Sequence, residues 1–122
     1  MISASPTSDA EHELFVSFVG ITENKGQVLF KIQNETGRDI HKNIIKVINK
    51  TASFNINLPK GKYAVSAFHD ANSNEKLDKN MVGFPTEKYG FSNDARGTFG
   101  PPELSDQLFT LDTSKKITIT LK

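Results

Sequence analysis

Apolar residues alternate with polar ones in short runs, and this period of two restricts the fold of the chain more than any other feature. The clearest run is residues 53–58, in which Phe54, Ile56 and Leu58 alternate with serine and asparagine. Successive side chains of a β-strand point to opposite faces, so such a run predicts a strand with one buried face. Residues 116–121 repeat the pattern, with threonine on the solvated face.

The same reasoning predicts five further strands, at residues 13–20, 27–33, 40–50, 62–68 and 107–111. The run 40–50 could also be a helical stripe, but its β-branched residues favour a strand. Neither face of residues 62–68 is very polar, which suits a central strand. The first two strands are expected to pair as a hairpin around residues 22–26, where asparagine and glycine allow a turn.

About seven short strands separated by frequent turns predict an all-β fold, an antiparallel β-sandwich of immunoglobulin or transthyretin type. The length of 122 residues fits one domain. We place this domain at residues 13–122, after a small, polar and disordered N-terminal tail over residues 1–12. The hydrophobic fraction of 36% agrees with a modest core.

Charge and composition exclude several classes of function. The net charge is +1 and no basic run exceeds two residues, so nothing indicates nucleic-acid binding. No apolar run approaches the length of a membrane span. The absence of cysteine excludes disulfides, zinc–thiolate sites and thiol nucleophiles. The tail resembles the start of a mature exported chain whose leader is absent from this sequence, so we expect a secreted or periplasmic protein.

Residues 70–105 show no regular period, yet they contain Phe84, Tyr89, Phe91 and Phe99. A loop longer than about 15 residues in a compact domain is usually functional or disordered. Four aromatic residues are too many for a solvated linker, so we expect one long ordered loop. Its aromatic side chains either cap one end of the sandwich or line a binding groove.

The motifs of this segment resemble those of a known family. They are H-D-x-N-x-N-x-x-L-D from His69, G-F-P from Gly83, Y-G-F-S-N from Tyr89 and F-G-P-P from Phe99. The family is one of small, secreted bacterial β-sandwich domains of unknown function. The resemblance implies an exported domain and supplies no catalytic residue. The usual glycine after the second asparagine is Glu75 here.

We expect the long segment to supply the surface that meets a partner. Its candidate residues are one histidine, one asparagine and four aromatics: His69, Phe84, Tyr89, Phe91, Asn93 and Phe99. The partner is a protein or a small ligand, and addition of a strand to an exposed sheet edge is a further mode of binding that stays open.

Oxygen-bearing side chains at every second residue after the strand 62–68 predict a cation site. In a calcium loop, positions 1, 3 and 5 supply side-chain oxygens, position 7 a backbone carbonyl, and position 9 a side chain or water. The matching residues are Asp70, Asn72, Asn74, Lys76 and Asp78. Met81 replaces the usual bidentate glutamate, so we expect weak calcium binding, with a Kd of about 10⁻⁴ to 10⁻³ M. The alternative is a series of Asx turns without an ion.

No nucleophile elbow, P-loop or H-E-x-x-H motif occurs, so we expect a protein that is not an enzyme. Of the three histidines, His12 lies in the predicted tail, His41 beside a turn, and His69 at the end of a strand. The alternative is a small hydrolase or other enzyme that uses His69 with Glu87 or Asp94. Acid–base chemistry would require these groups within hydrogen-bond reach.

Overall fold

The computed structural model describes residues 11–71, 73, 87–97 and 101–122. These residues form eight strands and two short helical turns: β1 (Glu11–Val19), β2 (Gln27–Asn34), β3 (Asp39–Lys46), β4 (Ala52–Pro59), β5 (Gly61–Asp70), β6 (Tyr89–Phe91), η2 (Ser92–Asp94), α1 (Leu104–Gln107), β7 (Phe109–Leu111) and β8 (Lys115–Thr120). Within the described part of the chain, no helix is long and apolar enough to span a membrane.

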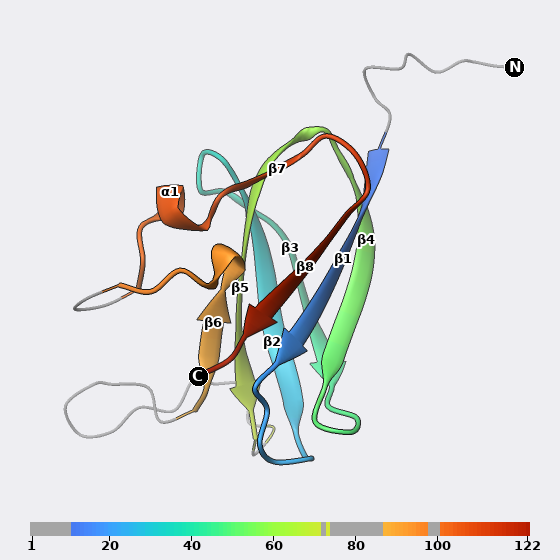
Figure 1. Cartoon of the computed structure of the whole chain (residues 1–122), viewed down its shortest axis with the longest axis vertical. Coiled ribbons are helices and arrows are strands. Elements are labelled where there is room, and N and C mark those ends of the chain that lie inside the picture. The colour runs from blue at the N-terminus through green and yellow to red at the C-terminus, as the bar shows by residue number, and fades with distance from the viewer. Residues whose placement is uncertain (1–10, 72, 74–86, 98–100) are drawn as a thin grey trace, which may run out of the picture.

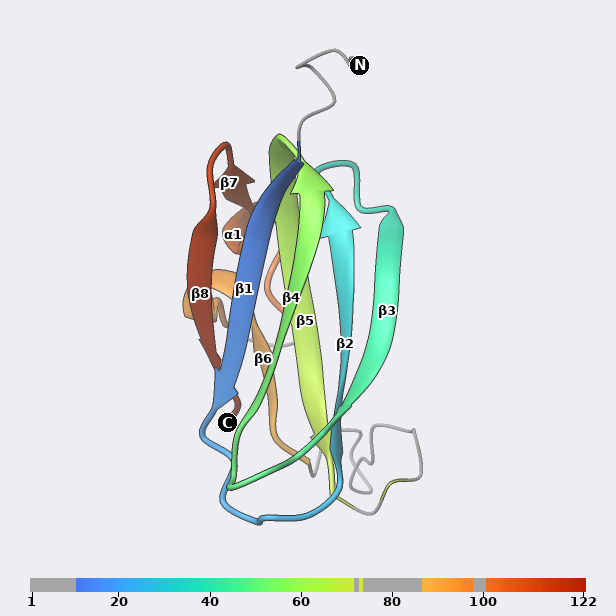
Figure 2. The ribbon, with the colours of Figure 1, turned by 90° about the vertical axis from the view of Figure 1, so that its right-hand side faces the viewer.

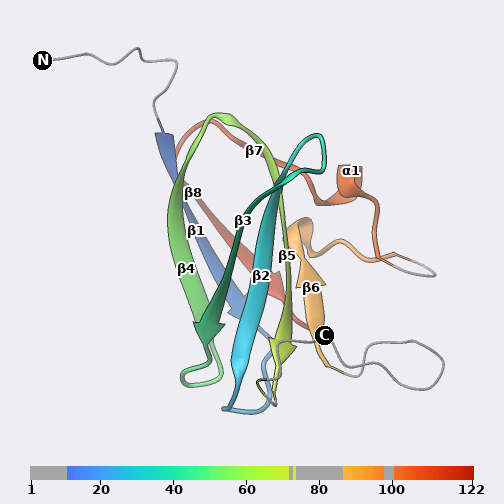
Figure 3. The ribbon, with the colours of Figure 1, turned by 180° about the vertical axis from the view of Figure 1, so that it is seen from behind.

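The strands form two sheets. The smaller sheet has the order β4-β1-β8, and its strands lie side by side in Figure 2. The larger sheet has the order β3-β2-β5-β6, seen from behind in Figure 3, and β7 pairs with the start of β5. Neighbouring strands are antiparallel except β1 and β8, which are parallel. The predicted all-β sandwich is therefore confirmed, with one parallel pair that alternation alone does not indicate.

Both sheets turn their apolar side chains toward a shared core. Phe18, Phe30 and Phe54 meet there, with the ring centroids of Phe30 and Phe54 3.9 Å apart and those of Phe18 and Phe54 6.0 Å apart. Other core residues come from both sheets: Leu14, Val16, Val28, Ile32, Val65, Leu111, Ile119 and Leu121. The period of two in each strand is thus satisfied by a single apolar layer between the sheets.

The predicted hairpin between the first two strands is wrong. β1 pairs with β4 and β8, whereas β2 pairs with β3 and β5, so β1 and β2 belong to different sheets. Ile21, in the connection between them, is only 5% exposed. The chain therefore crosses the end of the core instead of reversing in a tight turn. Alternation identifies the buried face of a strand but not its neighbours.

The structure differs from the predicted strands at two further places, the start of the first strand and the long segment. β1 begins at Glu11, so His12 belongs to a strand and not to the tail predicted over residues 1–12. β6 lies inside the segment predicted as a loop. Three residues are too few to show a period, which is why the sequence does not predict this strand.

The strand predicted over residues 40–50 is shorter in the structure, where β3 ends at Lys46. A turn follows, in which Asn49 and Lys50 have φ values of 53° and 60°. The backbone groups of Ile48 and Thr51 exchange two hydrogen bonds of 3.0 Å across it. Positive φ at both central residues is the geometry of a type I′ turn, so the chain reverses here.

β6 joins the two sheets along one side, where the C-terminus lies in Figure 1. The N–H of Tyr89 donates to the carbonyl of Lys122 at 3.1 Å, and the Lys122 N–H returns a bond of 3.0 Å. Arg96 Nη2 donates to the carbonyls of Tyr89 and Thr120, at 2.7 and 3.2 Å. A Cβ on Gly90 would lie 2.6 Å from the Thr120 oxygen, so this close approach requires glycine.

The chain after β6 is fastened over the first half of β5 by buried polar side chains. The hydroxyl of Ser92 accepts from the N–H of Val65 at 2.9 Å and donates to the carbonyl of Gln107 at 2.6 Å. Gln107 Nε2 donates to the carbonyl of Pro102 at 3.1 Å. The described parts of the long segment therefore pack on the larger sheet.

Candidate binding groove

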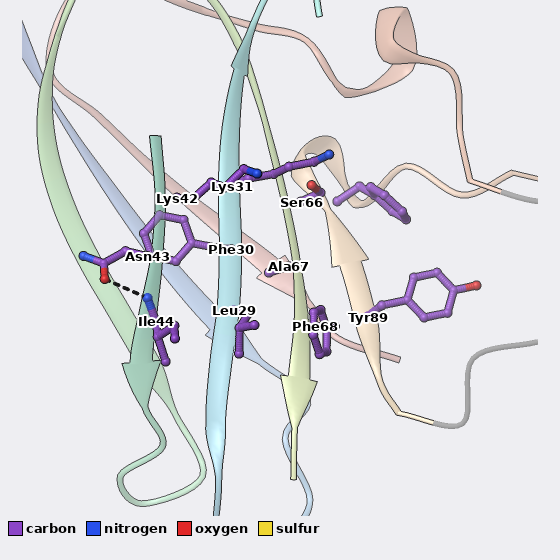
Figure 4. A pocket seen from close by; sticks show the side chains of 11 residues that line it. Leu29, Phe30, Lys31, Lys42, Asn43, Ile44, Ser66, Ala67, Phe68 and Tyr89 are labelled. Carbon is purple, nitrogen blue, oxygen red and sulfur yellow. Dashed lines mark hydrogen bonds between the residues drawn. The ribbon is translucent and has the colours of Figure 1, made fainter. Parts of the chain in front are cut away.

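The outer face of the larger sheet carries a row of apolar side chains. Ile44 on β3 lies opposite Leu29 on β2, Leu29 opposite Phe68 on β5, and Phe68 opposite Tyr89 on β6. Ile44 is 41% exposed, and the other three are partly exposed. We call these four residues the apolar row. Figure 4 shows Leu29 and Phe68 side by side within it. Contiguous exposed apolar side chains mark binding surfaces more often than single ones do.

A second row lies two residues further along each strand, on the same face of the sheet. It consists of Lys42, Lys31, Ser66 and Phe91, which are again successive register partners. The two rows line a groove of about 700 Å³, with further contributions from Phe30, Asn43 and Ala67. This volume lies within the range of about 300 to 1,000 Å³ that is typical of small-molecule sites.

Aromatic contacts hold the β6 wall of this groove in place. The rings of Tyr89 and Phe91 meet edge to face, with centroids 5.8 Å apart and planes at 81°. The guanidinium carbon of Arg96 lies 4.8 Å from the centroid of the Tyr89 ring. Both arrangements are favourable for an aromatic quadrupole, so the wall is positioned before any ligand arrives.

The β3 end of the groove is positively charged. The ammonium groups of Lys31 and Lys42 lie 3.8 and 3.5 Å from the two carboxylate oxygens of Asp39. Gln33 Nε2 also donates to Asp39, at 3.1 Å. The hydrogen bond from Gln33 and the two lysine charges lower the pKa of Asp39 below its usual 3.8. Two cations therefore face one anion at neutral pH.

A smaller pocket, of about 130 Å³, lies at the end of β5 and contains His69 and Glu87 in its lining. His69 is buried, and its Nε2 lies 2.7 Å from the carbonyl oxygen of Lys25. A carbonyl can only accept, so this nitrogen carries the proton and donates. The carboxylate of Glu87 accepts the N–H of Ala71 at 2.9 Å.

Asp94, the other carboxylate considered for His69, lies elsewhere. Its Oδ1 accepts the N–H of Thr120 at 2.8 Å, which fastens η2 to the end of β8. The structure therefore brings Glu87, and not Asp94, into the pocket that His69 lines.

Asp70 is the one predicted calcium ligand within the described residues. It ends β5, is fully buried, and its Oδ2 accepts from Gln27 Nε2 at 3.0 Å. Its carbonyl accepts the N–H of Ser73 at 3.3 Å. The remaining predicted ligands lie outside the described residues: Asn72, Asn74, Lys76 and Asp78. Among residues 11–71, 73, 87–97 and 101–122, no group of three or more His, Cys, Asp or Glu could hold a metal.

With this geometry in place, comparison with known proteins identifies a family. Residues 16–120 match the family described as "Uncharacterized protein conserved in bacteria (DUF2141)". The chain belongs to this family. The DUF2141 match runs from β1 to β8 and agrees with the resemblance to a bacterial family of unknown function. It does not test the individual motifs on which that resemblance depends.

No curated protein matches this DUF2141 chain. Among solved structures, a fimbrial assembly protein from Parabacteroides distasonis is similar, with a TM-score of 0.47 and 12% sequence identity. The alignment covers 91% of this chain and 52% of the other, so the chain spans about half the length of that protein.

The residues predicted for a partner surface divide between several places in this DUF2141 domain. Tyr89 and Phe91 line the groove. Asn93 does not, because its side-chain amide donates to the carbonyls of Asp106 and Leu108, at 3.2 and 2.9 Å. His69 lies in the smaller pocket. Two predicted residues lie outside the described part of the chain: Phe84 and Phe99.

The sequence analysis missed the strand residues of the groove, Leu29, Ile44 and Phe68. A signal for them was present. Neither face of residues 62–68 is very polar, and Leu29 interrupts the polar side of its strand. A second apolar face on neighbouring strands indicates either a covering layer or an exposed binding surface.

Proposed function

We propose that this protein is a non-enzymatic binding module, and that the groove on the larger sheet takes an apolar group of a small ligand or of a partner protein. The observation that carries the proposal is the apolar row, in which four strands each place one apolar side chain on the outer face. Covering such a row removes apolar area from water, at about 25 cal/mol per Å².

The proposal is tested with n-octanol, a neutral apolar probe, in a ¹⁵N NMR titration. We expect the largest shift changes at the amides of Leu29, Phe68 and Tyr89. Leu29→Asn should weaken binding about tenfold, because it places a polar group in the middle of the apolar row. The matched control is Val19→Asn on β1, in the other sheet. Shift changes confined to residues outside the groove would contradict the proposal.

We also propose that the domain is exported and that the Asp70 loop binds calcium weakly. Support for calcium comes from the alternating oxygen side chains, which begin where β5 ends. Support for export is the implied family of secreted domains, and fractionation of cells that express the full-length gene tests it. Recovery of the protein only in the cytoplasm would contradict export.

Calcium binding is tested by thermal melts in EDTA and in 10 mM calcium. A ligand at 100 times its Kd stabilises the folded state by about 2.7 kcal/mol. At the expected Kd, 10 mM calcium is about 10 to 100 times Kd, so for a domain of this size we expect a rise in Tm of roughly 5 to 10 °C. Magnesium should give a smaller rise, because its octahedral shell fits a flexible loop poorly. Asp78→Ala should abolish the rise in Tm that calcium produces. Identical wild-type melts in both buffers would contradict calcium binding.

The alternative function is an enzyme, and one observation favours it: Glu87 and His69 line the same pocket. Against it, the Nε2 proton of His69 is already donated to the Lys25 carbonyl, so this nitrogen is not a free base. We expect no hydrolysis of generic esters, phosphates or glycosides. Turnover by the wild type that disappears in a folded His69→Gln variant would overturn this expectation, since glutamine can still donate to Lys25.

A further inference from the structure

The two rows of the groove differ in chemistry from one end to the other. The apolar row crosses all four strands, from Ile44 to Tyr89. The neighbouring row begins with two lysines on β3 and β2 and ends with Ser66 and Phe91 on β5 and β6. One end of the groove is therefore apolar and cationic, and the other is apolar and aromatic.

We propose that the groove binds a small amphiphile with an anionic end, such as a medium-chain carboxylate, which rests on the proposed binding function of the same groove. The anionic group lies at Lys31 and Lys42, and the hydrocarbon chain runs along the apolar row toward Tyr89. Three steps between neighbouring strands, each of about 4.8 Å, give a path of about 14 Å. A medium-length acyl chain covers most of such a distance.

The charge of the groove selects an anion. Among the described residues that line it, Lys31 and Lys42 are charged and none is acidic. Asp39 stands at the rim, where its carboxylate faces both ammonium groups. One carboxylate cannot neutralise two cations, so an incoming anion gains attraction while an incoming ammonium meets like charge.

The size of the groove favours a small molecule over a protein surface. Its volume of about 700 Å³ is that of a ligand site. A stable protein interface covers about 800 Å² on each partner and needs a wider surface than two rows of side chains on four strands. The aromatic wall at Tyr89, held by Arg96, gives the hydrocarbon end a fixed surface.

The experiment compares three probes of equal chain length: octanoate, octanol and octylammonium. Affinities are measured by calorimetry at low salt, and contacts are located by NMR. We expect octanoate to bind about five- to tenfold more tightly than octanol, since exposed charge pairs are individually weak. Octylammonium should bind more weakly than octanol. The preference for octanoate should shrink in 0.5 M sodium chloride.

Two sets of variants make the test specific. Lys31→Gln with Lys42→Gln should remove the preference for octanoate over octanol. The matched control is Lys60→Gln with Lys116→Gln, which changes the net charge equally but lies outside the groove. Asp39→Asn should raise the preference for octanoate over octanol two- to threefold, because it removes the competing carboxylate. The asparagine still offers an acceptor to Gln33.

The outcomes separate the anionic ligand class from the more general proposal that the groove binds apolar groups. Equal binding of octanoate and octanol overturns the anionic ligand class and leaves the apolar groove as the binding site. A preference for octanoate that survives in the Lys31 and Lys42 double variant overturns it as well. Failure of all three probes to bind contradicts both this inference and the proposed function.

Discussion

The outer faces of the two sheets follow the same alternation, yet among the described residues only the larger sheet carries an apolar row. On the smaller sheet, Phe15 points outward from the central strand β1. Its register partners are Asn55 on β4 and Lys116 on β8. The amide of Asn55 donates to Glu13 at 2.9 Å, so polar groups surround the ring. An isolated outward phenylalanine of this kind is ordinary on a protein surface.

On the larger sheet, Phe68 occupies a similar place on β5, but its neighbours differ. Its register partners are Leu29 and Tyr89, and Leu29 in turn faces Ile44. The two phenylalanines are both partly exposed. What separates them is therefore their cross-strand neighbours and not their own exposure. Binding surfaces on a sheet are recognised from rows across strands, because those rows are the contiguous patches.

The largest expected effect tests the core that supports both outer faces. Phe18→Ala should cost about 3 to 5 kcal/mol in the free energy of unfolding, because Phe18 is fully buried against Phe30 and Phe54. Urea unfolding measures this loss. A cost below about 1 kcal/mol would show that the two sheets do not share a packed core, and the comparison of their outer faces would fail.

The next effect separates the two outer faces directly. Phe68→Ala and Phe15→Ala should each cost about 1 kcal/mol in the free energy of unfolding, since each ring is only partly buried. Octanol affinity should fall about tenfold in Phe68→Ala and stay unchanged in Phe15→Ala. The two variants are matched in residue type and in place on an outer face. Equal effects on binding would break the distinction.

A smaller effect concerns the wall at the edge of the larger sheet. Arg96→Ala should lower the free energy of unfolding by about 0.5 to 1 kcal/mol. The substitution removes an exposed cation–π contact with Tyr89 and two hydrogen bonds to backbone carbonyls. Octanol binding should weaken several-fold as the Tyr89 ring loses its support. Arg38→Ala, in the turn between β2 and β3, makes the same change of charge and should leave binding intact. Unchanged octanol binding in Arg96→Ala would remove this wall from the site.

The sequence predicts the strands well because each buries one face in a common core. The runs ending at Leu58 and Leu121 lie in the smaller sheet, and their alternation is satisfied by a buried and a solvated face. The sequence does not predict which strands pair with one another. β1 and β2 are neighbours in sequence but belong to different sheets, since the connection that contains Ile21 crosses the core. No local pattern encodes that crossing.

The groove is predicted only in part for a related reason. Tyr89 and Phe91 stand out as aromatics in an irregular segment, whereas Ile44 looks like an ordinary strand residue and Leu29 differs only in interrupting a polar side. Their significance arises from register, which places them beside Phe68. The pairing of Lys31 and Lys42 with Asp39 is likewise a product of the β2–β3 register. Sequence indicates the chemistry of each residue, but pairing creates the surface.

The smallest expected effect concerns the charges that distinguish the groove face. The folded-state pKa of Asp39 is lowered below 3.8, mainly by the hydrogen bond from Gln33 and then by Lys31 and Lys42. A lowered pKa means that the ionised carboxylate stabilises the folded state above pH 3.8. That contribution is lost as the pH falls through the folded-state value.

Titration of Asp39 by NMR measures this shift. Gln33→Ala should move the midpoint upward toward 3.8, and by more than Lys31→Gln does, because the hydrogen bond is the largest cause. High salt should screen the contribution of the lysines but leave that of Gln33. Lys60→Gln is the control and should leave the midpoint in place. A wild-type midpoint at or above 3.8 would mean that neither the hydrogen bond from Gln33 nor the two lysines stabilise the ionised carboxylate of Asp39.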